Sequence, residues 1–155
     1  KCAEALNNLK ENQKWGYLFA AAQSLCEVLS IKADLGVRTR QVYAEKNKEA
    51  LKTLIGDYQK LLEKMAIFYK AYKKQWFKEN KPHGFDIQDI RLGGLIMRVR
   101  SCMERLQDLY DGEISVIEEL EEKQLDFFGN GEDFKKKPDW YNSWSKIVTA
   151  NVISN

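Results

Sequence analysis

The stretch ENKPHGFDIQDIRLGGL, residues 79–95, separates the two longest amphipathic segments of the chain. A residue that precedes proline disfavours helical geometry, so the preceding helix is expected to end at Asn80. Proline presets one backbone angle and glycine allows conformations that other residues resist, which predicts a fixed, packed turn over residues 80–86 with Phe85 filling an apolar site. Asp86, with a second acid at Asp89, predicts the N-cap of the next helix.

The segments on both sides of this connector have helical periodicity. Before it, apolar residues recur three and four positions apart and give one wide apolar face: Leu51, Leu54, Ile55, Tyr58, Leu61, Leu62, Met65, Phe68, Tyr69, Tyr72 and Trp76. After it, the residues expected on the buried side are Ile87, Ile90, Leu95, Val99, Cys102, Met103, Leu106 and Tyr110. Gly93 and Gly94 within this helix predict a close approach of a neighbouring backbone.

The ends of the chain complete the fold prediction. One helical segment is expected from Tyr17 to Tyr43, with a kink or a close helix approach at Gly36. The β-branched residues 147–153 predict a single strand, which needs a partner strand. The sequence therefore predicts one all-α domain over residues 1–155, an antiparallel bundle of about four to five helices with a short C-terminal β-strand.

Composition limits the classes of partner. The 155 residues include 25 basic and 23 acidic side chains, a net charge of +2, so no overall field favours nucleic acid or an anionic membrane. No apolar run approaches the roughly 18 residues that a membrane span needs. Nucleic acid and membrane are therefore not expected as partners.

The three cysteines indicate a reducing compartment. Cys2, Cys26 and Cys102 are odd in number, widely spaced and at apolar helical positions, which favours buried free thiols over disulfides. The chain opens with Lys1 inside a helical pattern. We expect a fragment of a longer cytoplasmic polypeptide.

Few residues are candidates for chemistry, and no cofactor is expected. His83 is the only imidazole and no cysteine pair has ligand spacing, which argues against a zinc site. The acidic run 118–122 lacks the Glu-x-x-His partners of a di-metal bundle and is typical of solvated helix surface. His83 belongs either to a Ser–His–acid arrangement or to the hydrogen bonding of the connector, and nothing in the sequence places a serine beside it.

Two surface features each allow two interpretations. Trp140, Tyr141 and Trp144 in a polar loop could stack on a sugar ring, or anchor the terminal loop onto the bundle, which we favour. The arginines could bind RNA, but the acids interspersed among them favour ion pairs: Arg38, Arg40, Arg91, Arg98, Arg100 and Arg105.

Several motifs then carry a family resemblance along the chain. They are WGYLF at 15–19, IKADLGVRTR at 31–40, the connector 79–95, IEELEE at 117–122, Trp144 and VTANVI at 148–153. In this order and spacing the chain resembles the C-terminal helical domain of a cytoplasmic branch of glycoside hydrolase family 20, the bacterial β-N-acetylhexosaminidases.

This resemblance implies a function for the parent enzyme. Such enzymes remove terminal β-linked N-acetylglucosamine or N-acetylgalactosamine with retention, through attack by the substrate's own acetamido group, and need no metal. Their adjacent Asp-Glu pair lies on a (β/α)₈ barrel, whereas Glu132-Asp133 here has the reverse order in a loop. No residue of this chain is therefore expected to be catalytic.

The expected role is that of an accessory domain. It would pack on the catalytic barrel of the same polypeptide and meet glycan substrate only through the parent enzyme. It could also form a subunit interface in a homodimer. Its candidate interface or substrate-rim residues are His83, Phe85, Asp86, Trp140, Tyr141 and Trp144. The alternative is a free-standing helical module that binds a protein through the Tyr- and Trp-rich face of residues 51–76.

Overall fold

The computed structural model describes residues 2–123, which form six helices. In chain order they are α1 (Cys2–Asn7), α2 (Gly16–Lys32), α3 (Leu35–Glu45), α4 (Lys48–Glu79), α5 (Phe85–Asp111) and α6 (Glu118–Glu121). The all-α part of the sequence prediction is confirmed for these residues.

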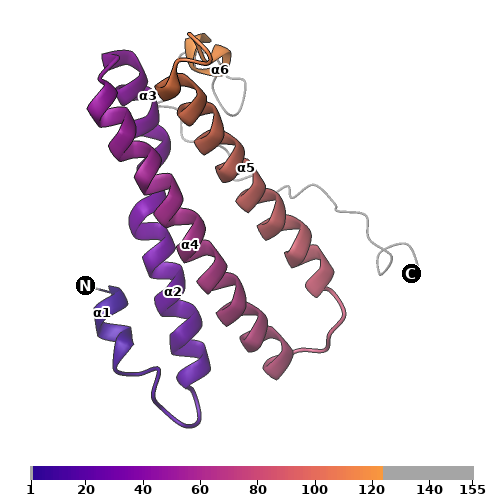
Figure 1. Cartoon of the computed structure of the whole chain (residues 1–155). Coiled ribbons are helices and arrows are strands. Elements are labelled where there is room, and N and C mark those ends of the chain that lie inside the picture. The colour runs from indigo at the N-terminus through magenta and orange to yellow at the C-terminus, as the bar shows by residue number, and fades with distance from the viewer. Residues whose placement is uncertain (1, 124–155) are drawn as a thin grey trace, which may run out of the picture.

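Helix α4 is the centre of the bundle. It packs against α2 on one flank and against α5 on the other, whereas α2 and α5 are not extensively paired with each other. Figure 1 shows α4 running antiparallel to both neighbours, with α3 and α6 at the end opposite the α4–α5 connector. α1 lies beside α2.

The ends of α4 follow from its sequence. The Asn47 side chain accepts hydrogen bonds from the backbone N–H groups of Glu49 and Ala50, at 3.0 and 3.1 Å, and so caps the first turn. The helix ends with Asn80 as its C-cap, two residues before Pro82. The predicted end of this helix is confirmed.

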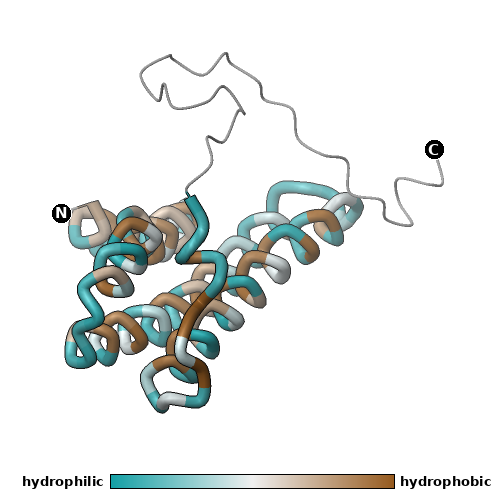
Figure 2. The backbone as a smooth tube through the Cα atoms, turned by 90° about the horizontal axis from the view of Figure 1, so that it is seen from above, coloured by the Kyte–Doolittle hydropathy of each residue, from teal (hydrophilic) through white to brown (hydrophobic). Residues whose placement is uncertain are grey.

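The core lies along the length of α4. Apolar and polar residues alternate around the helices (Figure 2), and the apolar side of α4 supplies most of the buried residues. The buried core cluster consists of Val28, Leu35, Leu51, Leu54, Tyr58, Leu61, Met65, Val99, Leu106 and Ile117. The predicted stripe of α4 is confirmed at its N-terminal and central turns.

On α5 the predicted stripe was too wide. Val99 and Leu106 are buried, but the side chains of Ile90 and Leu95 are 48% and 36% exposed. Among the described helices, α5 packs extensively against α4 alone, which covers one side of it. Ile90 precedes Val99 by two and a half helical turns and therefore points the opposite way.

The prediction of a C-terminal strand is corrected by the structure. The described residues form helices joined by turns and include no strand that could serve as its partner. Residues 147–153, on which the strand was predicted, lie outside the described residues. β-branched composition is a weak signal when no neighbouring strand supports it.

The segment from Tyr17 to Tyr43 was also predicted wrongly as one helix. α2 ends at Lys32 and α3 begins at Leu35, with Asp34 as the N-cap residue of α3. The break precedes Gly36, which has open space around its Cα, as do Gly93 and Gly94. The close backbone approach occurs at buried Gly16, where an added Cβ would lie 2.1 Å from the Lys10 carbonyl oxygen.

Two further sequence predictions concern thiols and membranes. Cys26 and Cys102 are half-buried and Cys2 is exposed, so the thiols are less buried than predicted. Cys2 lies on α1, a six-residue helix in which no residue is buried. Among the described helices, none combines the length and the apolar character that crossing a membrane requires.

Candidate functional site at the α4–α5 connector

The connector turns the chain at Gly84 and starts α5 at once. Gly84 is the N-cap residue with a φ of 91°, in the left-handed region that favours glycine. α5 therefore begins at Phe85, and the predicted N-cap role of Asp86 is wrong. Asp86 lies in the first turn, where its charge complements the helix dipole.

Phe85 is held in a cluster of aromatic rings. Its ring centroid lies 5.1 Å from that of Phe77, 5.7 Å from Trp76, 6.1 Å from Tyr72 and 6.2 Å from Tyr69. The side chain is only 3% exposed. All four neighbours come from the last turns of α4, so the predicted packing of Phe85 into an apolar site is confirmed.

Hydrogen bonds fix the turn itself. The indole Nε1–H of Trp76 donates to the carbonyl oxygen of Lys81 at 3.1 Å, and the backbone N–H of Phe85 donates to the carbonyl oxygen of Pro82 at 3.3 Å. The side chain that packs on Phe85 thus also binds the backbone of the turn. The connector is a packed turn, as predicted.

Charged groups border the ring cluster. The Lys73 ammonium lies 5.8 Å from the ring centroids of Tyr69 and Phe85 and 6.0 Å from that of Phe77, at the outer limit of cation–π attraction. The Tyr69 hydroxyl donates to Asp89 Oδ1 at 2.5 Å, and this bond raises the pKa of Tyr69. These contacts join the last turns of α4 to the first turns of α5.

The same end of α4 is tied to α2. The Tyr17 hydroxyl donates to Glu79 Oε1 at 2.8 Å, and the hydrogen bond raises the pKa of Tyr17. The Lys78 ammonium lies 3.8 Å from the centroid of the Tyr17 ring. The connector end of the bundle is therefore braced across all three long helices.

Of the six candidate site residues, the structure describes His83, Phe85 and Asp86, which lie together at the connector. Phe85 and Asp86 open α5, and Asp86 is half-buried. The His83 side chain is exposed and, within residues 2–123, has no hydrogen-bond or ion-pair partner. Trp140, Tyr141 and Trp144 lie outside the described residues. The interface or substrate-rim role of these six residues stays a prediction.

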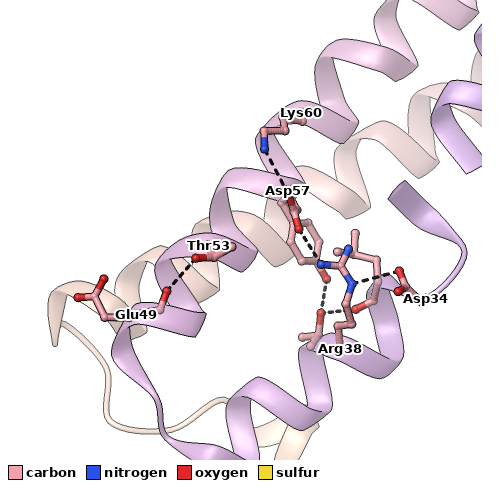
Figure 3. A network of polar contacts seen from close by, with 9 residues as sticks. Asp34, Arg38, Glu49, Thr53, Asp57 and Lys60 are labelled. Atoms are coloured by element: carbon pink, nitrogen blue, oxygen red, sulfur yellow. Dashed lines mark hydrogen bonds and ion pairs between the residues drawn. The ribbon is translucent and has the colours of Figure 1, made fainter. Parts of the chain in front are cut away.

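A second polar cluster joins α3 to α4 (Figure 3). Arg38 donates through Nη1 to Asp57 Oδ2 at 2.6 Å and through Nε to Asp34 Oδ1 at 3.1 Å. Lys60 lies 3.6 Å from Asp57 Oδ1. The hydrogen bond from Arg38 lowers the pKa of Asp57 most, which keeps this carboxylate ionised.

Beside it, two hydroxyl groups are buried between α3 and α4. Thr39 donates to the carbonyl oxygen of Leu35 at 2.7 Å, so its one proton is used and Tyr58 is the donor across the 3.0 Å bond to Thr39. Burial raises the pKa of Tyr58. The two side chains border a cavity of about 70 Å³ that Arg98 and Cys102 also line.

These contacts are structural in kind. Arg38 with Asp57, Tyr69 with Asp89 and Tyr17 with Glu79 each join two different helices. Within residues 2–123 no three His, Cys, Asp or Glu side chains are grouped as a metal site would need. The arrangement holds the bundle together and orders the connector.

Comparison with known families decides the identity of the domain. The family model described as the Glycoside Hydrolase 20C C-terminal domain matches residues 1–137. The chain belongs to this family. It is thus an accessory domain of a glycoside hydrolase family 20 enzyme, associated with the catalytic domain of the same polypeptide. No curated protein sequence matches the chain.

Sequence reasoning missed two features of this domain. The cross-helix pairs, such as Arg38 with Asp57, have no local signal because their partners are far apart in the sequence. The second feature is the outer side of α2, where Leu25 and Leu29 are 39% and 49% exposed. Its signal was present in the sequence, since Glu27 and Lys32 are the only charged residues of α2.

Proposed function

We propose that the parent enzyme is a β-N-acetylhexosaminidase, which hydrolyses terminal β-linked N-acetylglucosamine or N-acetylgalactosamine from glycans. The GH20C C-terminal domain is the family of this chain, and this match carries the proposal. Hydrolysis would take place on the catalytic barrel, with the acetamido group of the substrate as nucleophile.

The role of the present domain is to support that barrel. The ionisable groups whose pKa is shifted are engaged in contacts between helices, as in the pairs Arg38–Asp57 and Tyr69–Asp89. Such pairs are suited to rigidity rather than to proton transfer with a substrate. A catalytic domain whose loops rest on a rigid bundle keeps its active-site geometry.

The test compares the full-length enzyme with the chain 1–155 alone. Full-length enzyme is expected to release the aglycone from aryl β-N-acetylglucosaminides or β-N-acetylgalactosaminides, and the chain alone is expected to release none. Aryl β-glucosides serve as the control, because they lack the acetamido group that acts as nucleophile. Activity in the isolated chain, or equal turnover of the β-glucosides, would contradict the proposal.

We also propose a cytoplasmic location for the enzyme. The three cysteines within residues 2–123 are free, and their thiols range from half-buried to exposed. Exposed thiols such as that of Cys2 persist most readily in a reducing compartment. Fractionation of cells that express the native gene would test this, and recovery of the enzyme outside the cytoplasm would overturn it.

A further inference from the structure

One side of α2 carries an apolar stripe that no described helix covers. Trp15, Leu18, Ala22, Leu25 and Leu29 follow one another at alternating spacings of three and four residues. This spacing puts them on a single face of the helix and is the pattern of a helix–helix contact. We call these five residues the α2 seam.

The seam is exposed although α2 is packed on its other sides. The side chains of Trp15, Leu25 and Leu29 are 44%, 39% and 49% exposed, Ala22 is exposed as well, and Leu18 is half-buried. Buried Ala21, Ser24 and Val28 lie on another side of the same helix. A contiguous exposed apolar patch of this kind marks an interaction surface.

The composition of α2 also indicates a covered helix. Among its 17 residues only Glu27 and Lys32 are charged, and Glu27 is engaged by Lys64 of α4 at 2.7 Å. A helix that is apolar on nearly every side is typical of a protein interior. α4 and α1 supply only part of that interior.

The neighbouring helix α1 is likewise not buried. It has six residues, no buried residue, and packs beside α2. A helix this short is not stable without tertiary contacts. Because a C-terminal domain follows the rest of its polypeptide, the preceding domain enters through α1, on the α1–α2 side of the bundle.

We infer that the α2 seam is the surface on which the catalytic domain of the same polypeptide docks, through an apolar face of one of its helices. This inference rests on the proposed function only in taking a barrel as the preceding domain. A (β/α)₈ barrel is ringed by helices and offers such a face. The outer side of α5 fits less well, since exposed Met97 has Arg98 and Arg100 beside it.

The test is hydroxyl-radical footprinting of the full-length enzyme with residue-level mass spectrometry. Leu25 and Leu29 are compared with Leu95 on α5, a leucine that is 36% exposed in this domain. In the full-length enzyme Leu95 is expected to be oxidised while Leu25 and Leu29 are protected, at every protein concentration. Oxidation of Leu25 and Leu29 as fast as Leu95 would overturn the inference. Protection that disappears on dilution would also overturn it, because it would assign the seam to a second copy. In the chain 1–155 alone all three leucines are expected to be oxidised, and protection of Leu25 and Leu29 there would overturn the inference by assigning the seam to another segment of this chain.

A pair of double variants of the full-length enzyme gives an independent test. L25Q with L29Q replaces seam residues that are 39% and 49% exposed, and the control L95Q with M97Q replaces α5 residues that are 36% and 54% exposed. Glutamine has a helix propensity close to those of leucine and methionine. We expect the seam variant alone to show a lower melting temperature and faster proteolysis between the two domains. Equal behaviour of the two variants would contradict the inference.

The outcomes separate this inference from the proposed function. Hydrolysis of an aryl β-N-acetylglucosaminide is measured on the same full-length protein. An active enzyme with an unprotected seam overturns the docking surface and leaves the proposed function in place. A protected seam in an enzyme that hydrolyses only other glycosides supports the docking surface and overturns the proposed substrate class.

Discussion

Replacing Phe85 by alanine should destabilise the domain more than any other change at the connector. The side chain is 3% exposed and lies within ring-contact distance of four aromatic side chains of α4. Truncation of a buried phenylalanine to alanine typically costs about 3–5 kcal/mol, because transfer energy is lost and a cavity remains. Since a domain is stable by about 5–15 kcal/mol, a large share of the total would be lost.

Phe77 is the matched control for this experiment. It is also a phenylalanine of the cluster and lies 5.1 Å from Phe85, but its side chain is 46% exposed. F77A should therefore cost about 1 kcal/mol, since only part of the side chain leaves a buried environment. F85L retains most of the volume and should cost about 1–2 kcal/mol, which keeps the comparison measurable if F85A is largely unfolded.

The assay is urea unfolding of the chain 1–155, followed by far-UV circular dichroism. The midpoint should fall in the order wild type, F77A, F85A, with an unchanged slope. A loss below about 1 kcal/mol for F85A, or equal losses for F77A and F85A, would refute the reasoning. Such a result would mean that the ring cluster does not fix the connector.

Three further predictions concern other parts of the bundle. G16A should lower the free energy of unfolding by about 1–3 kcal/mol, because its Cβ would lie 2.1 Å from the Lys10 carbonyl oxygen. G94A has open space around the added Cβ and should stabilise the isolated chain. Equal effects of the two variants in urea unfolding would contradict this. The lowered pKa of Asp57 stabilises the fold above the unfolded pKa of about 3.9, and this contribution is lost as the pH falls through the folded pKa. The stability difference between wild type and D57N should therefore shrink on acidification below pH about 4, and a difference independent of pH would argue against the Arg38 pair. All three thiols should react with Ellman's reagent without reductant, Cys2 faster than half-buried Cys26 and Cys102, and a disulfide found by mass spectrometry would overturn this.

Helices α4 and α5 could be predicted because their signals are local. The apolar stripe from Leu51 to Met65 predicts the buried face of α4. Pro82 sets the end of α4 because the residue before a proline disfavours helical geometry. Phe85 was identified for a similar reason, since proline, glycine and an aromatic residue together specify a shaped turn. Local periodicity and turn chemistry are thus sufficient for α4 and for the packing of Phe85 in the connector.

Features that depend on tertiary contacts could not be predicted in the same way. Gly93 and Gly94 were expected at a close approach, and Gly36 at a kink or a close approach. The helix does break just before Gly36, but the close approach is at Gly16, because it depends on where the loop at Lys10 folds back. The N-cap was predicted at Asp86 but lies at Gly84, because Gly84 adopts the left-handed conformation that lets α5 start at Phe85. The pairing of Arg38 with Asp57 likewise depends on how α3 lies across α4.

The candidate site was predicted only in its packing. Residue types at the connector indicated a rigid turn, which the contacts of Phe85 and Trp76 confirm. They did not indicate which side of the bundle meets the catalytic domain. The apolar outer side of α2 gives that signal only when α4 and α1 are known to leave it uncovered.

We propose that this domain supports a catalytic barrel and takes no part in the chemistry. The most direct measurement is the thermal inactivation half-life of the full-length enzyme and of a truncated enzyme that lacks residues 1–155, with and without the separate chain added. We expect the truncated enzyme to inactivate much faster, and the added chain to restore part of the lost half-life without contributing activity of its own. A truncated enzyme with the half-life and turnover of the full-length protein would contradict the claim.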